Sequence, residues 1–295
     1  MQRFKGIKKI DKTHLEEISP DEFRQISFQI FKTFVRFCDE HHLRYFLAGG
    51  TLIGAVRHQG FVWWDDDMDI TMPRPDFEKF RELTKSGHLA QYKIMSIYHT
   101  PKEHSLPFLR IEDDNFFADS TELAQVIYAW IDIMPWDGLP QNSEQHWKKV
   151  QQLKSFNYFA RFPRKRLIRG KYKEFKFLLN NLLYIASIPF KIVGAHQYAL
   201  KIDELGKKYD FETAAHVGTF VAGYGPKEEM PKWWFIDEKI GERYLFFEGI
   251  KARVPAHYDL VLQHMYGDFM TLPKKKKTHI IQAYRVIKNR EETNV

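Results

Sequence analysis

The segment Tyr45–Arg74, YFLAGGTLIGAVRHQGFVWWDDDMDITMPR, decides how this chain folds. It opens with an apolar, strand-like run, turns at a Gly-Gly-Thr corner and continues with apolar residues at helical spacing. A second turn then leads through an aromatic run to the acidic sequence Asp65–Ile70, after which strand-like residues resume. This order of strand, glycine corner, helix and acidic strand predicts an α/β unit with a functional site at the corner.

The acidic residues predict a metal site. Side chains alternate between the two faces of a strand, so Asp67 and Asp69 are expected to point the same way, with Asp65 beside them if the strand begins that early. Carboxylates crowded on one face repel one another unless a cation lies between them. An all-oxygen ligand set favours Mg²⁺ or Mn²⁺. A lone acidic run is usually a solvated turn, and the strand pattern that follows is what favours a metal here.

The glycine corner predicts a phosphate-binding half of the same site. Gly49 and Gly50 allow close approach of a ligand to the backbone, and Thr51 adds a hydroxyl where the helix begins. The helix presents its free N–H groups and positive dipole end to an anion. Arg57, roughly 9 Å along the axis, and His58, on nearly the same face as Thr51, are the predicted phosphate contacts. A Gly-Gly-Thr on its own would be an ordinary strand-to-helix turn.

Together these motifs resemble a known family. Gly-Gly-Thr followed by two alternating aspartates resembles the nucleotidyltransferase superfamily, which has the fold of polymerase beta. The fuller string GGTLIGAVRH…WWDDDMDITMPRPDF is similar to the LicD family of phosphocholine transferases, whose distant animal relatives are fukutin and fukutin-related protein. Two later stretches match the same family, IDIMPWDG at Ile131–Gly138 and PAHYDLVLQHMYGDFMTLP at Pro255–Pro273.

A lone acid in an apolar run is a further candidate. Asp132 lies within Trp130–Met134, which is typical of a buried central strand, and a carboxylate buried there needs a partner. An arginine or backbone hydrogen bonds would make Asp132 structural. The family pattern instead places a third metal carboxylate at this position, so we expect Asp132 to complete the metal site and to accept the proton of an acceptor hydroxyl.

The resemblance implies a reaction and its partners. It implies transfer of phosphocholine, or a similar phospho-alcohol, from CDP-choline or another CDP-alcohol to a sugar hydroxyl, with release of CMP. The acceptor would be a lipid-linked precursor of a cell-surface glycan, such as a teichoic acid or a lipopolysaccharide. A choline head group needs an aromatic cage. The candidates are Trp136, Tyr224, Trp233 and Trp234, although aromatic residues in this composition are more often core.

Glu248 is a possible substrate contact. It belongs to a Phe-Glu-Gly element that resembles a recurrent element of the family. It would hold an acceptor hydroxyl or a substrate cation, or it would be an ordinary surface acid.

Composition narrows the classes of function. The 295 residues, 44% of them hydrophobic, suffice for one large domain with an insertion or for two modest ones. The net charge of +7 favours anionic partners. The single cysteine, Cys38, excludes an intrachain disulfide and a cysteine-rich zinc site. The sequence shows neither a secretory signal nor a clear membrane span, which predicts a cytoplasmic protein.

The fold class expected is α/β (α+β), a nucleotidyltransferase-like mixed twisted sheet flanked by helices. Residues 1–146 would form the catalytic core, residues 147–210 a basic helical insertion, and residues 211–295 the part that completes the catalytic domain. A helix capped at Ser19 should run to about His41 with an apolar stripe. The polar residues Glu112–Asn115 predict a solvated hairpin turn between two strands.

The predicted insertion has two interpretations. Residues 161–176, RFPRKRLIRGKYKEFK, carry eight basic side chains and one acidic one, and an apolar stretch interrupted by polar residues follows. It is either a basic loop before a core helix or a segment lying on an anionic membrane, at the inner face of the plasma membrane, with Phe177, Leu178 and Leu182 inserted.

Two other functions fit part of the pattern. A template-independent nucleotidyltransferase would transfer NMP from an NTP and release pyrophosphate. No nucleic-acid-binding module is recognisable beside the core, so we expect no nucleic-acid partner. A non-catalytic binding protein on the same fold is the other alternative, and the intact set of carboxylates argues against it.

Overall fold

The computed structural model describes residues 15–120, 126–141, 144–161, 174–214, 216–219, 241–272 and 280–287. The chain divides into two compact units. Unit 1 comprises the residues up to Met95, Leu109–Met134 and the residues from Ile240 onward, whereas unit 2 comprises Ser96–Phe108 and Pro135–Lys239. The segments of unit 2 are therefore insertions into the sequence of unit 1. The predicted division at residues 146 and 210 stays a prediction.

Unit 1 combines helices with most of the strands. Its helices are α1 (Pro20–Glu40), α2 (Gly49–Arg57), α3 (Arg74–Leu83) and α7 (Tyr258–Tyr266) among the residues described. Its strands are β1 (Leu15–Ile18), β2 (Phe46–Leu47), β3 (Asp69–Pro73), β4 (His88–Leu89), β5 (Tyr92–Met95), β6 (Leu109–Ser120), β9 (Glu242–Phe247), β10 (Ile250–Pro255), β11 (Ile280–Val286) and the first part of β7 (Val126–Leu139).

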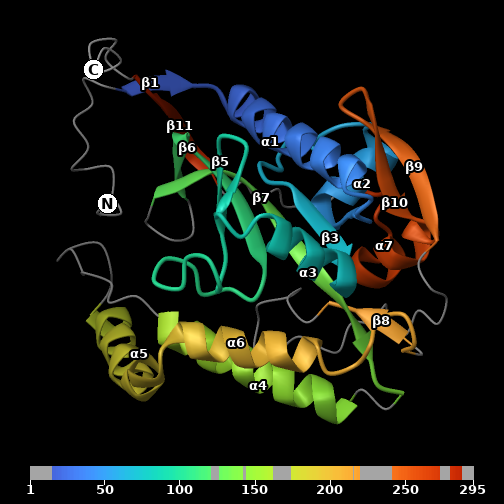
Figure 1. Ribbon diagram of the computed structural model, residues 1–295. Helices are drawn as coiled ribbons and strands as arrows, with labels where there is room; N and C mark the ends of the chain where they lie inside the picture. The colour runs from blue at the N-terminus through green and yellow to red at the C-terminus, as the bar shows by residue number, and fades with distance from the viewer. Residues whose placement is uncertain are drawn as a thin grey trace. The chain divides into compact units, whose positions relative to one another are not determined.

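The sheet is organised around the long strand β6. The strand order is β1-β11-β6-β7-β3-β2 (Figure 1). Along one edge β6 pairs with β7, and its other edge is shared by β5, opposite residues 110–112, and β11, opposite residues 116–120. The hairpin β9–β10 forms a separate two-stranded sheet. The α/β (α+β) fold class predicted from the sequence is confirmed.

Helix α1 forms as its sequence predicts. The Ser19 side chain accepts a hydrogen bond of 3.1 Å from the backbone N–H of Glu22, and Pro20 occupies the first turn. Its apolar stripe is buried, and Phe34 meets the rings of Tyr45 and Phe80 edge-on at centroid distances of 5.5 and 5.4 Å. These contacts join α1 to the chain entering β2 and to α3.

The hairpin β9–β10 closes over the same core. Buried Phe247 lies 6.2 Å from Phe28, 6.4 Å from Phe31 and 5.1 Å from Phe61, measured between ring centroids. Arg253 donates hydrogen bonds to the carbonyl of Leu43, at 2.8 Å, and to the carboxylate of Asp39, at 2.7 Å. The C-terminal part of the chain is thereby fixed to α1 and to the residues that follow it.

The predicted hairpin turn at Glu112–Asn115 is wrong. These residues lie within β6, where the pairing with β7 shifts register between Asp113 and Phe117. The Asp113 carboxylate accepts hydrogen bonds from the backbone and side-chain nitrogens of Asn115, at 3.0 and 2.7 Å. This local turn produces a bulge that keeps the strand direction, and it leaves Glu112 and Asp113 buried where the sequence suggested solvated acids.

Unit 2 is mainly helical. It contains α4 (Glu144–Arg161), α5 (Glu174–Val193), α6 (Ala195–Gly206), and strand β8 (His216–Gly218), which pairs with the end of β7. The three helices lie side by side, and Phe190 of α5 packs 5.0 Å from Phe156 and 5.5 Å from Phe159 of α4. Across the described parts of the chain, no helix combines the length and the apolar character that crossing a bilayer requires.

We predict that Phe34→Ala destabilises the protein by about 3–5 kcal/mol, because it opens a cavity between α1, Tyr45 and Phe80. Urea unfolding followed by circular dichroism measures this change. Phe246→Ala is the matched control, since Phe246 is exposed and its loss should cost less than about 0.5 kcal/mol. Equal effects of the two substitutions would contradict this account of the core.

Candidate active site

The candidate site lies where β2 gives way to α2 and where β3 begins. The N–H of Ala48 donates to the carbonyl of Asp69 at 3.0 Å, and the N–H of Asp69 donates to the hydroxyl oxygen of Thr51 at 2.9 Å. The N–H of Asp132 on β7 donates to the carbonyl of Met68 at 2.9 Å. The glycine corner, the acidic segment and β7 are thus joined at one point, as the sequence predicts.

Both glycines of the corner lie against carboxylates. A Cβ atom on Gly49 would lie 2.5 Å from Oδ2 of Asp69, and one on Gly50 would collide with Oδ2 of Asp65. Gly49 also has a φ of +52°, which favours glycine. The absence of side chains at the corner is therefore what leaves room for the acids beside the N-terminus of α2.

The acids themselves meet by a different route from the one predicted. Strand β3 begins only at Asp69, so Asp65 and Asp67 precede it, and the alternation of strand faces does not apply to them. Carboxylate oxygens of Asp65, Asp66 and Asp67 nevertheless lie within 4.8 Å of one another. Asp66, which is buried, was not among the four predicted ligands.

The electrostatics of this cluster are unfavourable without a cation. Burial, followed by the charge of Asp67, raises the pKa of Asp65 from 3.8 to about 8. The pKa of Asp69 is raised well above its ordinary value, first by burial and then by the charges of Asp67, Asp132 and Asp65. Asp65, Asp67 and Asp132 therefore all lie within range of the Asp69 carboxylate.

Asp132 has an arginine partner as well. It lies directly opposite Arg110 in the β6–β7 register, and the guanidinium donates from Nε to Oδ1 at 2.7 Å and from Nη2 to Oδ2 at 2.8 Å. Arg110 in turn lies 5.0 Å from the ring centroid of Trp130. Asp132 is therefore both the ion-pair partner of Arg110, as the structural interpretation expects, and a neighbour of Asp69. The two hydrogen bonds from Arg110 fix the orientation of the Asp132 carboxylate.

Tyr266 was not among the predicted site residues, but it lies near the acids. Burial of its hydroxyl, followed by the charges of Asp69, Asp65 and Asp67, raises the pKa of Tyr266, although the residue as a whole exposes 46% of its surface. Tyr266 is the last residue of α7. The available signal was its position in the C-terminal stretch that resembles the LicD family.

Arg57 and His58 lie at the opposite end of α2 from Gly49 and Gly50. Nη1 of Arg57 donates to the carbonyl of Phe269 at 2.7 Å, and its guanidinium lies 5.7 Å from the ring centroid of Trp64. His58 meets Trp64 edge-on at 6.4 Å between ring centroids. Burial lowers the pKa of both side chains, and the charge of Arg57 lowers that of His58 further. Their predicted contacts with phosphate stay predictions.

Glu248 holds the turn that leads to the acidic segment. Its Oε1 accepts a hydrogen bond from the N–H of Phe61 at 3.1 Å, and its backbone N–H donates to the carbonyl of Gln59 at 2.9 Å. Oε2 accepts from the side-chain amide of Gln25 at 3.4 Å. A Cβ on Gly60 would collide with Oε1. Both carboxylate oxygens of Glu248 thus have partners within the protein.

The aromatic candidates for a choline cage do not gather at this corner among the residues described. Trp136 is buried, with 4% exposure, within unit 2. Tyr224, Trp233 and Trp234 lie outside the described residues. Trp63, by contrast, precedes the acidic cluster by two residues and exposes 56% of its surface. It packs 5.0 Å from Trp64, measured between ring centroids.

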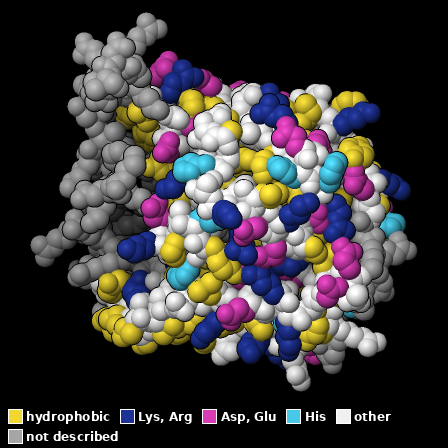
Figure 2. Space-filling model, in the orientation of Figure 1, with side chains coloured by type: hydrophobic (Ala, Val, Ile, Leu, Met, Phe, Trp, Pro, Cys, Tyr) yellow, Lys and Arg dark blue, Asp and Glu magenta, His cyan; other side chains and the backbone are white. Residues whose placement is uncertain are grey.

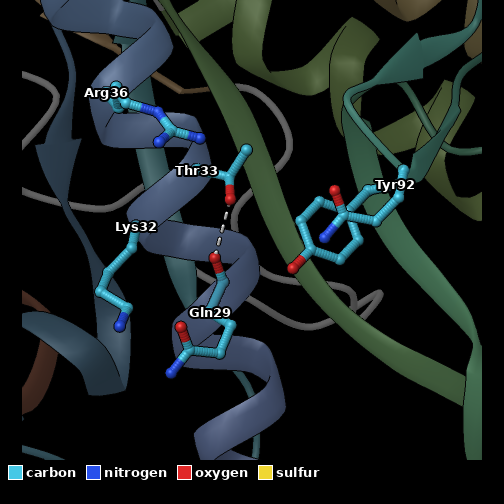
Figure 3. A pocket seen from close by; sticks show the side chains of 6 residues that line it. Gln29, Lys32, Thr33, Arg36 and Tyr92 are labelled. Atoms are coloured by element: carbon cyan, nitrogen blue, oxygen red, sulfur yellow. Dashed lines mark hydrogen bonds between the residues drawn. The ribbon is translucent and has the colours of Figure 1, made fainter.

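A cavity of about 380 Å³ lies elsewhere in unit 1. Figure 3 shows the α1 side chains on one side of it and Tyr92 on the other. Among the residues described, the lining consists of Gln29, Lys32, Thr33, Arg36, Gln91 and Tyr92, two of which are cationic. No described residue that the sequence predicted to bind metal, phosphate or substrate belongs to this lining.

The structure thus holds carboxylates at a glycine corner between a strand and a helix, on an α/β sheet. Residues 42–167 match the family described as "LicD/FKTN/FKRP, nucleotidyltransferase domain". The chain is 26% identical over 277 residues to the lipopolysaccharide cholinephosphotransferase LicD of Haemophilus influenzae, which covers 92% of this chain and 99% of that protein.

Shorter similarities connect the chain to uncharacterized rickettsial proteins. Identity to one from Rickettsia typhi is 33% over 67 residues, 23% of this chain and 22% of that protein. Identity to one from Rickettsia prowazekii is 39% over 49 residues, 17% of this chain and 18% of that protein. These similarities confirm the resemblance to the LicD family that the motifs of the chain carry.

We predict that the metal-free protein loses stability as the pH rises from about 4 to about 8. In this window the folded state keeps a proton on Asp65, whose pKa is raised from 3.8 to about 8, whereas the unfolded chain has released it. The unfolded state therefore binds fewer protons, and the free energy of unfolding falls with increasing pH. Thermal unfolding in a chelator, at steps of pH, measures the slope.

Asp65→Asn should make this pH dependence shallower, because it removes one of the carboxyl groups whose pKa is raised and leaves Asp69. Asp114→Asn, at an exposed acid, should keep it. A wild-type melting temperature that rises steadily from pH 4 to pH 8 would contradict the raised pKa of Asp65.

Proposed function

We propose that this enzyme transfers phosphocholine, or a similar phospho-alcohol, from a CDP-activated donor to a sugar hydroxyl of a lipid-linked glycan precursor, releasing CMP. The observation that carries the proposal is the group of carboxylates packed against Gly49 and Gly50. The full-length similarity to a relative named as a lipopolysaccharide cholinephosphotransferase supports the substrate class. A lipopolysaccharide or teichoic acid precursor would fit this acceptor class.

The donor set fits a divalent cation. It consists of carboxylate oxygens alone, and the raised pKa values of Asp65 and Asp69 indicate that the fold holds these acids together against their repulsion. Asp65, Asp67 and Asp69 would hold Mg²⁺ or Mn²⁺, with Asp132 beside them. A cation there supplies neutralisation of the charge on the transferred phosphoryl group and of the leaving CMP.

The residues around the acids have complementary tasks in this proposal. The N-terminus of α2 at Gly49–Thr51 lies beside the carboxylates, so its free N–H groups attract the donor phosphates. Asp132 accepts the proton of the acceptor hydroxyl, with Arg110 fixing the carboxylate in one orientation. Most of the rate enhancement would come from positioning and charge neutralisation.

The head group of the donor requires an exposed aromatic face. Trp136 is buried and cannot offer one, whereas the exposed ring of Trp63 lies two residues before Asp65. A quaternary ammonium group is attracted to the face of an indole ring and to nearby carboxylates. Trp63 is therefore our candidate for choline recognition in the described part of the chain.

The defining assay is incubation with CDP-choline, CDP-ribitol and each NTP in the presence of Mg²⁺ and an acceptor glycan. We predict release of CMP from a CDP-alcohol. Asp67→Asn and Asp69→Asn should each lower turnover by at least about 100-fold, because a metal ligand is lost while the fold is kept. Asp114→Asn is the control. Release of pyrophosphate from an NTP would instead show a nucleotidyltransferase.

The role of Asp132 is separable from its ion pair. Asp132→Asn should abolish turnover and also lower the melting temperature, because Arg110 loses its charged partner. In the double variant Arg110→Met/Asp132→Asn no unpaired charge is left, so stability should recover while turnover does not. Thermal unfolding and CMP release measure the two effects. Turnover that returns in the double variant would show that Asp132 serves only as the partner of Arg110.

A further inference from the structure

Helix α5 has an apolar face that points away from its neighbours. Exposed side chains recur along it in steps of three or four, at Leu179, Leu182, Ile185, Ile188 and Ile192. Ile192 exposes 81% of its surface, Ile185 59% and Leu182 54%. Residues at this spacing share one side of a helix. The stripe therefore runs along the described length of α5.

The opposite side of α5 is the side that packs on unit 2. Phe190 packs against the rings of Phe156 and Phe159, at 5.0 and 5.5 Å between centroids, and Ser187 is fully buried. Lys191 donates to the carbonyl of Ala160 at 3.2 Å, so the described cation nearest the end of α5 is directed toward α4. A helix at the surface of a protein in water ordinarily has its polar residues outward, and in α5 this order is reversed.

The outward stripe belongs to a larger apolar surface. Val193 adds an exposed side chain at the end of α5. Figure 2 shows hydrophobic side chains gathered at the lower left, over the place that α5 occupies in Figure 1. Exposed apolar surface of this kind marks contact with another molecule more often than contact with water.

The charge of the adjoining sequence favours a lipid partner. Eight of the sixteen residues from Arg161 to Lys176 are basic and one is acidic, and this stretch leads directly into α5. Apart from Arg161, the basic lead up to residue 173 lies outside the described residues, and its contribution here is its charge alone. Cationic residues next to an exposed apolar helix are the combination that binds anionic membrane surfaces.

We propose that α5 docks this enzyme on an anionic lipid surface, with the side chains of Leu182, Ile185 and Ile192 inserted shallowly between the head groups. If the enzyme has the proposed function, on which this step rests, the contact confines the enzyme and its lipid-linked acceptor to one plane. The helix lies in the surface and does not cross it, in agreement with the absence of a membrane-crossing helix from the described residues. A second copy of the chain would bury the apolar stripe equally well, but its basic residues before α5 would repel the same basic residues of the first copy.

The test is co-sedimentation of the full chain with vesicles of phosphatidylcholine alone or mixed with phosphatidylglycerol. We expect binding to the anionic vesicles at low salt, weaker binding at high salt, and little binding to the neutral ones. Leu182→Ser/Ile185→Ser/Ile192→Ser should lower the partition coefficient by roughly ten-fold or more. These side chains are exposed, so the fold should persist, which circular dichroism checks.

The matched control replaces three exposed apolar residues of unit 1, Leu83→Ser/Phe246→Ser/Ile287→Ser, and should bind like the wild type. Replacing Arg164, Lys165, Arg166 and Arg169 with Ser should remove the preference for anionic lipid. Equal loss in the α5 variant and the control, or no binding to either vesicle at low salt, would overturn the proposal. A dimer in sedimentation equilibrium that the α5 variant dissociates would assign the stripe to a second copy instead.

Activity distinguishes this inference from the function on which it rests. Transfer to a short, water-soluble acceptor should be the same in the α5 variant and the wild type, while transfer to an acceptor embedded in vesicles should fall. If neither the wild type nor any variant releases CMP while the wild type still binds anionic vesicles, the proposed function is contradicted and the lipid contact is supported.

Discussion

Mutual repulsion between carboxylates is the constraint on which unit 1 depends. Burial and the charge of Asp67 raise the pKa of Asp65 to about 8, and burial together with the charges of Asp67, Asp132 and Asp65 raises the pKa of Asp69. The fold accommodates these acids with glycines that leave space, a threonine that fixes where β3 begins, and Arg110, whose charge lowers the pKa of Asp69. Local instability of this kind is common at functional sites, where the surrounding structure compensates for it.

The compensating structure comes from distant parts of the sequence. Glu248, at the tip of the hairpin β9–β10, holds the turn at Gln59–Phe61 that precedes the acids. Phe247 anchors the same hairpin by packing against Phe31 of α1. The carbonyl of Phe269 accepts a hydrogen bond from Arg57 on α2. The C-terminal residues that resemble the LicD family therefore support the corner that the N-terminal motif creates, and neither stretch forms the site alone.

The sequence was informative where the signals are local. The cap at Ser19 and the stripe of α1 follow from nearest neighbours and helical spacing. The meeting of glycines with acids was predicted from the order of the motifs, although the acids reach the corner by a different route. Signals that depend on pairing between strands were not visible. The fork between Arg110 and Asp132 requires the β6–β7 register, and the approach of Tyr266 requires the packing of α7. Glu112–Asn115 was predicted as a turn because composition cannot distinguish a bulge from a chain reversal.

The interrupted sequence of unit 1 has a consequence for its biosynthesis. A ribosome makes residues in order, and β1 pairs with β11, so that Leu15 can face Val286 only after the intervening residues have been made. Unit 2 is complete by residue 239, long before β11 emerges. Until then the stretch of β6 at residues 116–120 has an open edge, which is a template for wrong pairing with other chains. The strand that carries Arg110 therefore keeps an unpaired edge until β11 has been made.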